Sequence, residues 1–122
     1  MPLKITVDPS ATPTLKLEGR LDTDTAPELD GALNKVLERK GIKRLVFEVS
    51  GLDYLSSAGI RCFVRARKAI EPGGGTVAIV NPQPGVRKVL EIVKAIPAKG
   101  IFASVAELDE YLDAIQSQIR DQ

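Results

Sequence analysis

Apolar and polar side chains alternate in two short runs near the amino terminus of this chain. Residues 3–7 (LKITV) and 14–19 (TLKLEG) both follow a period of two, and the turn-forming run DPSATP lies between them. This alternation is typical of half-buried strands. It predicts two strands joined by a turn, in a hairpin.

The spacing of apolar residues then changes to that of a helix, over the run TDTAPELDGALNKVLERKG. Thr25 can cap this helix, and Glu28 lies at capping-box spacing from it. Gly41 supplies the expected stop. The apolar residues that fall on one helical face are Leu29, Leu33, Val36 and Leu37.

Strands and helices alternate along the remaining chain. Strands are predicted at 44–50 (RLVFEVS), 76–80 (TVAIV) and 101–103, and helices at 58–71, at 86–96 and after a cap at Ser104. Because helices separate the later strands, those strands should be parallel. The order predicts an α/β fold over residues 1–122, as a single domain with a mixed central β-sheet of about five strands and about four packing helices.

Composition narrows the class of function. The 122 residues carry 17 basic and 16 acidic side chains, and only 4% of them are aromatic, so nucleic-acid binding is not expected. The amino terminus has no signal-peptide pattern, and no apolar run is long enough to span a membrane. With Cys62 as the single cysteine, we expect a cytoplasmic protein without a membrane partner.

Histidine is absent from the sequence, which argues against several kinds of catalytic site. The run from Leu55 to Gly59 is half of a G-x-S-x-G nucleophile elbow, but its first glycine is missing and no histidine can take the serine proton. The glycines at 73–75 follow a helix and precede a strand, the reverse of a phosphate-binding loop. One cysteine and no histidine also fail to indicate a metal site. The chain is therefore predicted not to be an enzyme and to need no cofactor.

Two adjacent serines stand where the strand at 44–50 gives way to the following helix, in the run LDYLSSAGIRCF. Ser57 can be an ordinary N-cap, or one of the hydroxyls can be a chemical target. A helix amino terminus suits a phosphate group, because its free N–H groups carry a partial positive charge. Gly59 in the first turn would let another molecule approach the cap closely.

The run from Leu45 to Ile60, LVFEVSGLDYLSSAGI, resembles the phosphorylation loop of the STAS-domain anti-sigma factor antagonists. The segments LEGRLDTDTAPEL (17–29) and GGTVAIVNPQPGVRKVLEIVKA (74–95) are similar to other parts of that family, in the same order. In the family pattern the target serine follows an aspartate and stands two residues before the glycine. The resemblance places the target at Ser57, with Ser56 at the aspartate position and as the alternative acceptor.

The resemblance implies a partner-switching protein. Unphosphorylated, it would bind an anti-sigma factor that is also a serine kinase of the GHKL type, and so release a sigma factor. Phosphorylation would abolish that binding, and a metal-dependent serine phosphatase would restore it. ATP would belong to the kinase. The same fold also serves as a docking module in transporters, lipid-transport complexes and stress-sensing assemblies, where the serine would only cap a helix.

Charged residues near the serine pair extend this interpretation. Asp22 is expected to shape or polarise the phosphorylation site, and Asp24 to contact a partner, although aspartates are also frequent in turns and at helix starts. Arg61, Arg65 and Lys68 recur at helical spacing and would form a basic face for a partner with an acidic patch. A solvated helix face is the alternative explanation.

Overall fold

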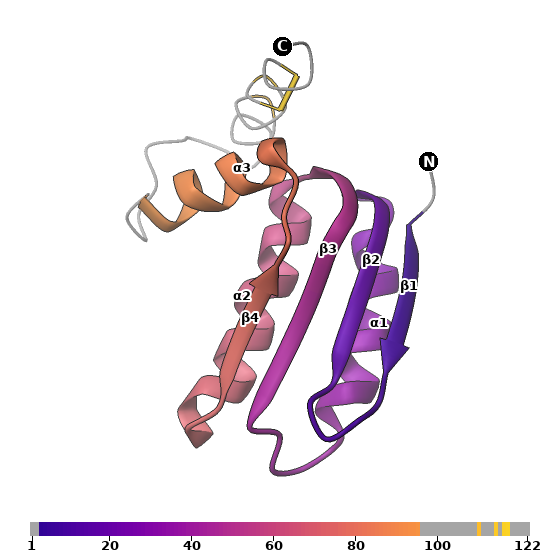
Figure 1. The fold of residues 1–122 in the computed structure, drawn as a ribbon, viewed down its shortest axis with the longest axis vertical. Helices are drawn as coiled ribbons and strands as arrows, with labels where there is room; N and C mark the ends of the chain where they lie inside the picture. Colours follow the sequence, from indigo (N-terminus) through magenta and orange to yellow (C-terminus); the bar gives the residue numbers. More distant parts are fainter. Residues whose placement is uncertain (1–2, 96–109, 111–113, 115, 118–122) are drawn as a thin grey trace.

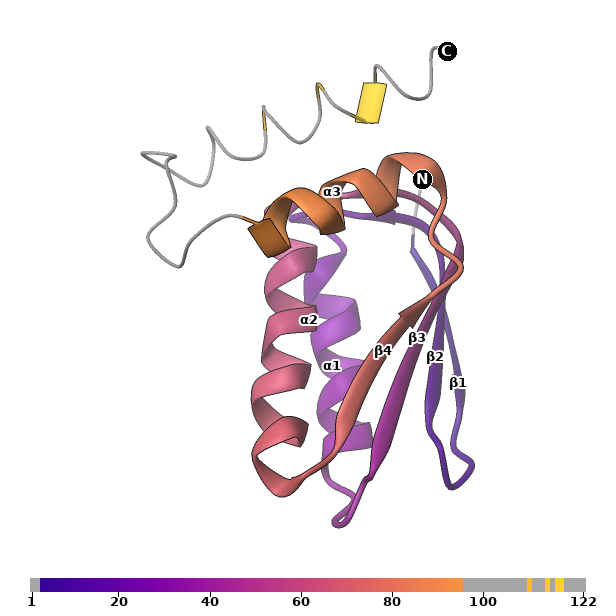
Figure 2. The same ribbon diagram turned by 60° about the vertical axis from the view of Figure 1, so that its left-hand side comes forward.

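Two α-helices lie side by side against one face of a β-sheet, and a third helix crosses one end of that sheet (Figure 1, Figure 2). The computed structural model describes residues 3–95, 110, 114, 116 and 117. Within these residues the α/β class predicted from the sequence is confirmed, with a sheet of four strands. No helix in the described segments has both the length and the hydropathy that a bilayer crossing would need.

The elements follow one another in the predicted order. They are β1 (Lys4–Asp8), β2 (Thr14–Leu21), α1 (Ala26–Leu37), β3 (Arg44–Leu55), α2 (Ser57–Ile70), a single 3₁₀ turn (Glu71–Gly73), β4 (Thr76–Val80) and α3 (Pro84–Ala95). The predicted strand at 101–103 and the cap at Ser104 lie outside the described residues. Of the predicted last helix, Glu110, Ala114, Gln116 and Ser117 are described, and all four are helical.

The strands run β1-β2-β3-β4 across the sheet. β1 pairs antiparallel with β2, as the predicted hairpin requires, whereas β2 with β3 and β3 with β4 are parallel pairs. The sheet is therefore mixed, as predicted. Because β2 and β3 are parallel, their carboxyl ends meet at the same edge of the sheet.

β3 is longer than the predicted range 44–50, because the run Gly51-Leu52-Asp53 continues the strand. This part of β3 pairs with residues 18–21 of β2 across two register shifts. Leu52 is fully buried, and a Cβ at Gly51 would lie 2.7 Å from Cγ of Glu18. Close strand pairing thus overrides the local turn signal of glycine and aspartate.

The core lies between the sheet and helices α1 and α2. Leu15 and Leu17 of β2 and Leu45 of β3 are fully buried, and they face the apolar stripes of the two helices. Phe47 of β3 meets Phe63 of α2 edge to face, with ring centroids 4.8 Å apart. Because this packing holds α2 on the sheet, it also determines where α2 begins and where the serine pair lies.

Candidate functional site

The loops that follow β2 and β3 lie next to each other at the carboxyl edge of the sheet. Leu21 and Leu55, the last residues of the two strands, are paired, and the N–H of Ser56 donates a 2.9 Å hydrogen bond to the carbonyl oxygen of Leu21. The loop at 22–25 therefore adjoins the serine pair. This edge is the position at which open α/β sheets usually keep their functional sites.

Of the two serines, Ser56 occupies the N-cap position of α2, the position that the capping alternative assigned to Ser57. Ser56 has extended backbone angles, φ −96° and ψ 173°, and its carbonyl oxygen accepts the N–H of Ile60 at 3.0 Å. Its hydroxyl makes no capping bond. Ser57 is the first residue of the helix and points its side chain into the protein, with 4% of its surface exposed.

Both serine hydroxyls are buried within residues 55–59, the end of β3 and the start of α2, which we call the serine loop. Ser56 is 3% exposed, and its Oγ makes no hydrogen bond within the described part of the chain. The Oγ of Ser57 is likewise inaccessible to solvent. In this conformation neither hydroxyl is accessible from the solvent.

Gly59 has a different role from the open approach that its sequence position suggested. The residue is buried, and a Cβ placed on it would lie 2.5 Å from Cγ of Leu21 and 2.7 Å from Cδ1 of Leu55. The missing side chain lets the first turn of α2 pack directly on the ends of β2 and β3. Gly59 therefore shapes the site by setting how closely the first turn of α2 approaches the sheet.

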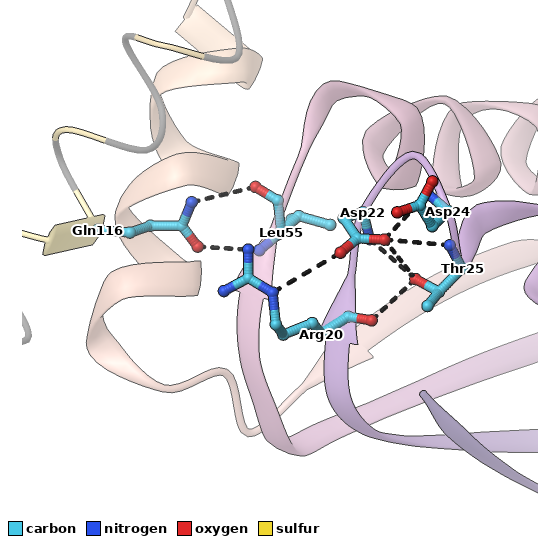
Figure 3. Close-up of polar contacts among 6 residues, drawn as sticks. All are labelled: Arg20, Asp22, Asp24, Thr25, Leu55 and Gln116. Atoms are coloured by element: carbon cyan, nitrogen blue, oxygen red, sulfur yellow. Dashed lines mark hydrogen bonds and ion pairs between the residues drawn. The ribbon is translucent and has the colours of Figure 1, made fainter. Parts of the chain in front are cut away.

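Asp22 organises the loop after β2. One carboxylate oxygen accepts the backbone N–H groups of Asp24 and Thr25, both at 3.0 Å (Figure 3). Burial raises the pKa of the Asp22 carboxyl, but the hydrogen bonds from Thr25 and Asp24 and the charge of Arg20 together outweigh it and leave the pKa below its ordinary value. Asp22 therefore places a negative charge on the loop that adjoins the serine pair.

Thr25 does not form the predicted capping box. Its hydroxyl donates to the carbonyl oxygen of Arg20 at 2.8 Å and accepts the N–H of Asp22 at 2.9 Å, so it bridges the two ends of the loop. Glu28 bonds instead to the backbone of Thr25, its N–H donating to the carbonyl oxygen at 2.9 Å. Asp24 is exposed and contributes its backbone N–H to the loop.

Arg20 also belongs to the site, although its sequence context gives no signal for such a role. Its guanidinium lies 3.9 Å from the centroid of the Tyr54 ring, on the neighbouring strand. The Nε atom of Arg20 is also 3.6 Å from Oδ2 of Asp22 (Figure 3). Arg20 and Tyr54 are paired across β2 and β3, a juxtaposition that depends on the register shift and has no signal in the local sequence.

The basic residues expected to form one face of α2 differ in their surroundings. Arg65 forms an ion pair with Asp30 of α1 and so helps to hold the two helices together. Arg61 is exposed, as is Lys68. Arg61 and Arg65 also line a cavity of about 210 Å³ between α1 and α2, together with Ala58, next to the serine pair.

Cys62 is a packing residue between the two helices. It is 2% exposed, and its Sγ lies 3.4 Å from Oδ1 of Asp30. Burial, with the nearby Asp30 charge, raises the pKa of the thiol to about 12. The described residues hold no cluster of acidic or cysteine side chains that could bind a metal ion.

Gln116 reaches the site from a distant part of the chain and was missed by the sequence analysis. Its side-chain amide forms two hydrogen bonds with the backbone of Leu55, the residue before the serine pair (Figure 3). For this segment the sequence predicted only a helix after Ser104. Nothing in the sequence indicated that a polar residue 61 positions away would contact β3.

The comparison with known protein families gives one match over most of the chain: the STAS domain, over residues 3–108. BtrV of Bordetella bronchiseptica, whose name describes it as an anti-sigma factor antagonist, is 33% identical over 76 residues. That match covers 62% of this chain and 65% of the relative, just under two thirds of its length.

Solved structures share the fold. An anti-sigma factor antagonist from Mycobacterium paratuberculosis superposes with a TM-score of 0.67 at 21% identity, over 98% of this chain and 95% of that one. The Bacillus cell fate determinant SpoIIAA in its phosphorylated form superposes with a TM-score of 0.58 at 18% identity, over 75% of this chain and 82% of that one.

Proposed function

The chain belongs to the STAS domain family, and from that premise we propose that it is an anti-sigma factor antagonist controlled by phosphorylation of Ser57. Unphosphorylated, residues 1–122 would act as one STAS domain that binds an anti-sigma factor and so releases a sigma factor. The anti-sigma factor would be a GHKL-type serine kinase that modifies Ser57, and a metal-dependent serine phosphatase would reverse the modification. The chain itself would perform no catalysis.

The position of Ser57 is the observation that carries this proposal. Ser57 is the first residue of α2, at the carboxyl edge of the sheet, and it adjoins the loop organised by Asp22. A phosphate there gains from the partial positive charge of the helix amino terminus. SpoIIAA, which shares this fold and is named an anti-sigma factor antagonist, has been solved in a phosphorylated form, and this supports control of the present chain by phosphorylation.

Burial and charge explain why such a modification would act as a switch. A phosphate adds about −1.5 to −2 charges and needs room that the buried Ser57 hydroxyl does not have. The Asp22 carboxylate, whose pKa is low, adds negative charge on the adjoining loop. Phosphorylation would therefore displace the serine loop, and with it the surface on which the anti-sigma factor docks.

The docking surface would combine exposed residues on both sides of the serine pair. Asp24 is exposed on the loop after β2, and Arg61 is exposed one turn along α2. Charges of opposite sign on the two sides would orient a partner on the surface. Arg65 would contribute less to binding, because it is engaged with Asp30.

The test is a pull-down from the native host with four baits: the wild type, Ser57→Ala, Ser57→Asp and Ser56→Ala, with bound proteins identified by mass spectrometry. A GHKL-type kinase should be captured by every bait except Ser57→Asp, and phosphate recovered on wild-type protein should map to Ser57. Equal capture of transporter or scaffold subunits by all four baits would contradict the switch and indicate a docking module.

A further inference from the structure

Gln116 holds the end of β3 with the oxygen and the nitrogen of its side-chain amide. The N–H of Leu55 donates to Oε1 at 2.9 Å, and Nε2 donates to the carbonyl oxygen of Leu55 at 3.1 Å. Gln116 is only 4% exposed, so these bonds lie in a protected environment. A Cβ on Gly85 would lie 3.7 Å from Cγ of Gln116, which places the side chain between β3 and the first turn of α3.

The two hydrogen bonds of Gln116 occupy backbone groups of Leu55 that β4 does not reach. On one side β3 is paired with β2 as far as Leu55, but on the other side β4 pairs with it only as far as Glu48. The N–H of Ser56 donates to Leu21 of β2. Because successive residues of a strand direct their backbone polar groups to opposite sides, the N–H and C=O of Leu55 point away from β2, toward the edge that β4 does not reach. Gln116 satisfies both of these groups.

Leu55 directly precedes the two serines whose hydroxyls are buried, so its backbone fixes where the serine pair begins. The loop can expose Ser57 only if the end of β3 or the start of α2 moves. Gly59 packs on the Leu55 side chain, and Gln116 bonds to the Leu55 backbone. Leu55 is thus restrained from two directions, and one restraint comes from the carboxyl-terminal part of the chain.

We propose that Gln116 is a positioning residue that keeps the serine loop closed, so that loss of its hydrogen bonds with Leu55 increases the exposure of the Ser57 hydroxyl. The inference rests on the proposed function for its biological meaning, because the closed loop would limit phosphorylation. Its physical content, the coupling of Gln116 to loop opening, can be measured without a kinase.

The experiment compares Gln116→Met with Gln83→Met in the purified full chain. Methionine keeps most of the side-chain volume of glutamine and removes its hydrogen bonds. Gln83 is the matched control, because its Nε2 also donates to the β3 backbone, to the carbonyl oxygen of Ser50 at 2.8 Å, away from the serine pair. Circular dichroism and urea unfolding establish that each variant is folded.

Two readouts report on the loop. The first is the hydrogen-exchange rate of the Leu55 amide by NMR. The second is the rate at which Ellman's reagent modifies a thiol introduced by Ser57→Cys, added separately to the wild-type, Gln116→Met and Gln83→Met backgrounds. The natural thiol, Cys62, is buried and has a pKa of about 12, so it contributes little to the signal.

Both rates should rise about tenfold or more with Gln116→Met, since it leaves a buried donor and a buried acceptor of Leu55 without a partner. Gln83→Met should leave both unchanged. Unchanged rates in Gln116→Met, or equal increases in both variants, would overturn the proposal. Neither result depends on Ser57 being a natural phosphorylation site, so a failure of the proposed function in the pull-down is recognised separately.

Discussion

Gly59 of α2 packs so closely on Leu21 of β2 that any side chain at position 59 would force the leucine to shift. A Cβ on Gly59 would lie 2.5 Å from Cγ of Leu21, a distance that real side chains do not adopt. The first turn of α2, and therefore the serine pair, sits at a height above the sheet that this contact fixes. The relationship connects core packing directly to the geometry of the proposed site.

Gly59→Ala should destabilise the protein, although alanine is the better helix former. Forcing a methyl group against Leu21 and Leu55 is overpacking, which costs about 1–3 kcal/mol. Gly31→Ala in α1 is the matched control, because a Cβ there meets nothing within 4 Å, and it should stabilise by roughly 0.5–1 kcal/mol. Urea unfolding of both variants measures the difference. Similar effects in the two variants would contradict the packing role.

Asp22 should make the stability of the protein fall in acid. Its pKa is lower in the folded state than in the unfolded chain, so its contribution is fully present above the unfolded pKa and is lost as pH falls through the folded one, below about pH 4. Asp22→Asn removes this titration. Urea unfolding between pH 7 and pH 3 should give the variant a lower stability at pH 7 and a shallower loss in acid. Parallel curves for the two proteins would contradict the prediction.

The ion pair between Asp30 and Arg65 should contribute little to stability. Both side chains are partly exposed, at 43% and 41%, and pairs of that kind are worth about 0–1 kcal/mol. A double-mutant cycle with Asp30→Ala and Arg65→Ala should give a coupling energy in that range.

Arg61→Ala, on the exposed side of the same helix, should leave stability within about 0.5 kcal/mol and weaken partner binding. Stronger loss of binding in Arg65→Ala than in Arg61→Ala would contradict the assignment of Arg61 to partner binding and of Arg65 to the ion pair with Asp30.

Cys62 should be inert in the native protein. With a thiol pKa of about 12, its thiolate population at pH 8 is roughly one part in ten thousand, and burial limits access further. Ellman's reagent should therefore react with the native wild type only slowly and with the guanidinium-unfolded chain at once. Rapid reaction of the native thiol would show that helices α1 and α2 separate around Cys62.

The elements were predictable because their signals are local. The two-residue period of the runs before Leu21 and the helical spacing of Leu29 and Leu33 depend only on which face is buried, so the observed strands and helices follow the expected ranges. The extension of β3 through Leu52 was not predictable, since it depends on pairing with β2. A glycine followed closely by an aspartate favours a turn when the neighbouring strand is not known.

The site was predictable to a smaller extent. The serine pair and Asp22 have local signals and lie on adjoining loops, as the resemblance implied. The contacts of Arg20 and Gln116 depend on tertiary structure alone. A register shift places Arg20 beside Tyr54, and Gln116 comes from a segment that the sequence predicted only to be helical.

Ser56 stands at the N-cap position of α2, where a serine hydroxyl normally stabilises the start of a helix. Replacing a capping serine by alanine typically costs about 1 kcal/mol. Here the hydroxyl of Ser56 makes no capping bond and is buried without a hydrogen bond in the described part of the chain. Because alanine removes a buried polar group that is not satisfied, Ser56→Ala should be neutral or slightly stabilising in urea unfolding.

The variant also bears on which serine is the acceptor. Ser56→Ala should still carry phosphate at position 57 when the protein is isolated from the native host, whereas Ser57→Ala should carry none. A loss of about 1 kcal/mol in Ser56→Ala would show that the Ser56 hydroxyl caps α2 in solution. Loss of phosphate in Ser56→Ala, with retention in Ser57→Ala, would make Ser56 the acceptor. The two measurements are independent, because one reports the folded state of the loop and the other reports the choice made by the kinase.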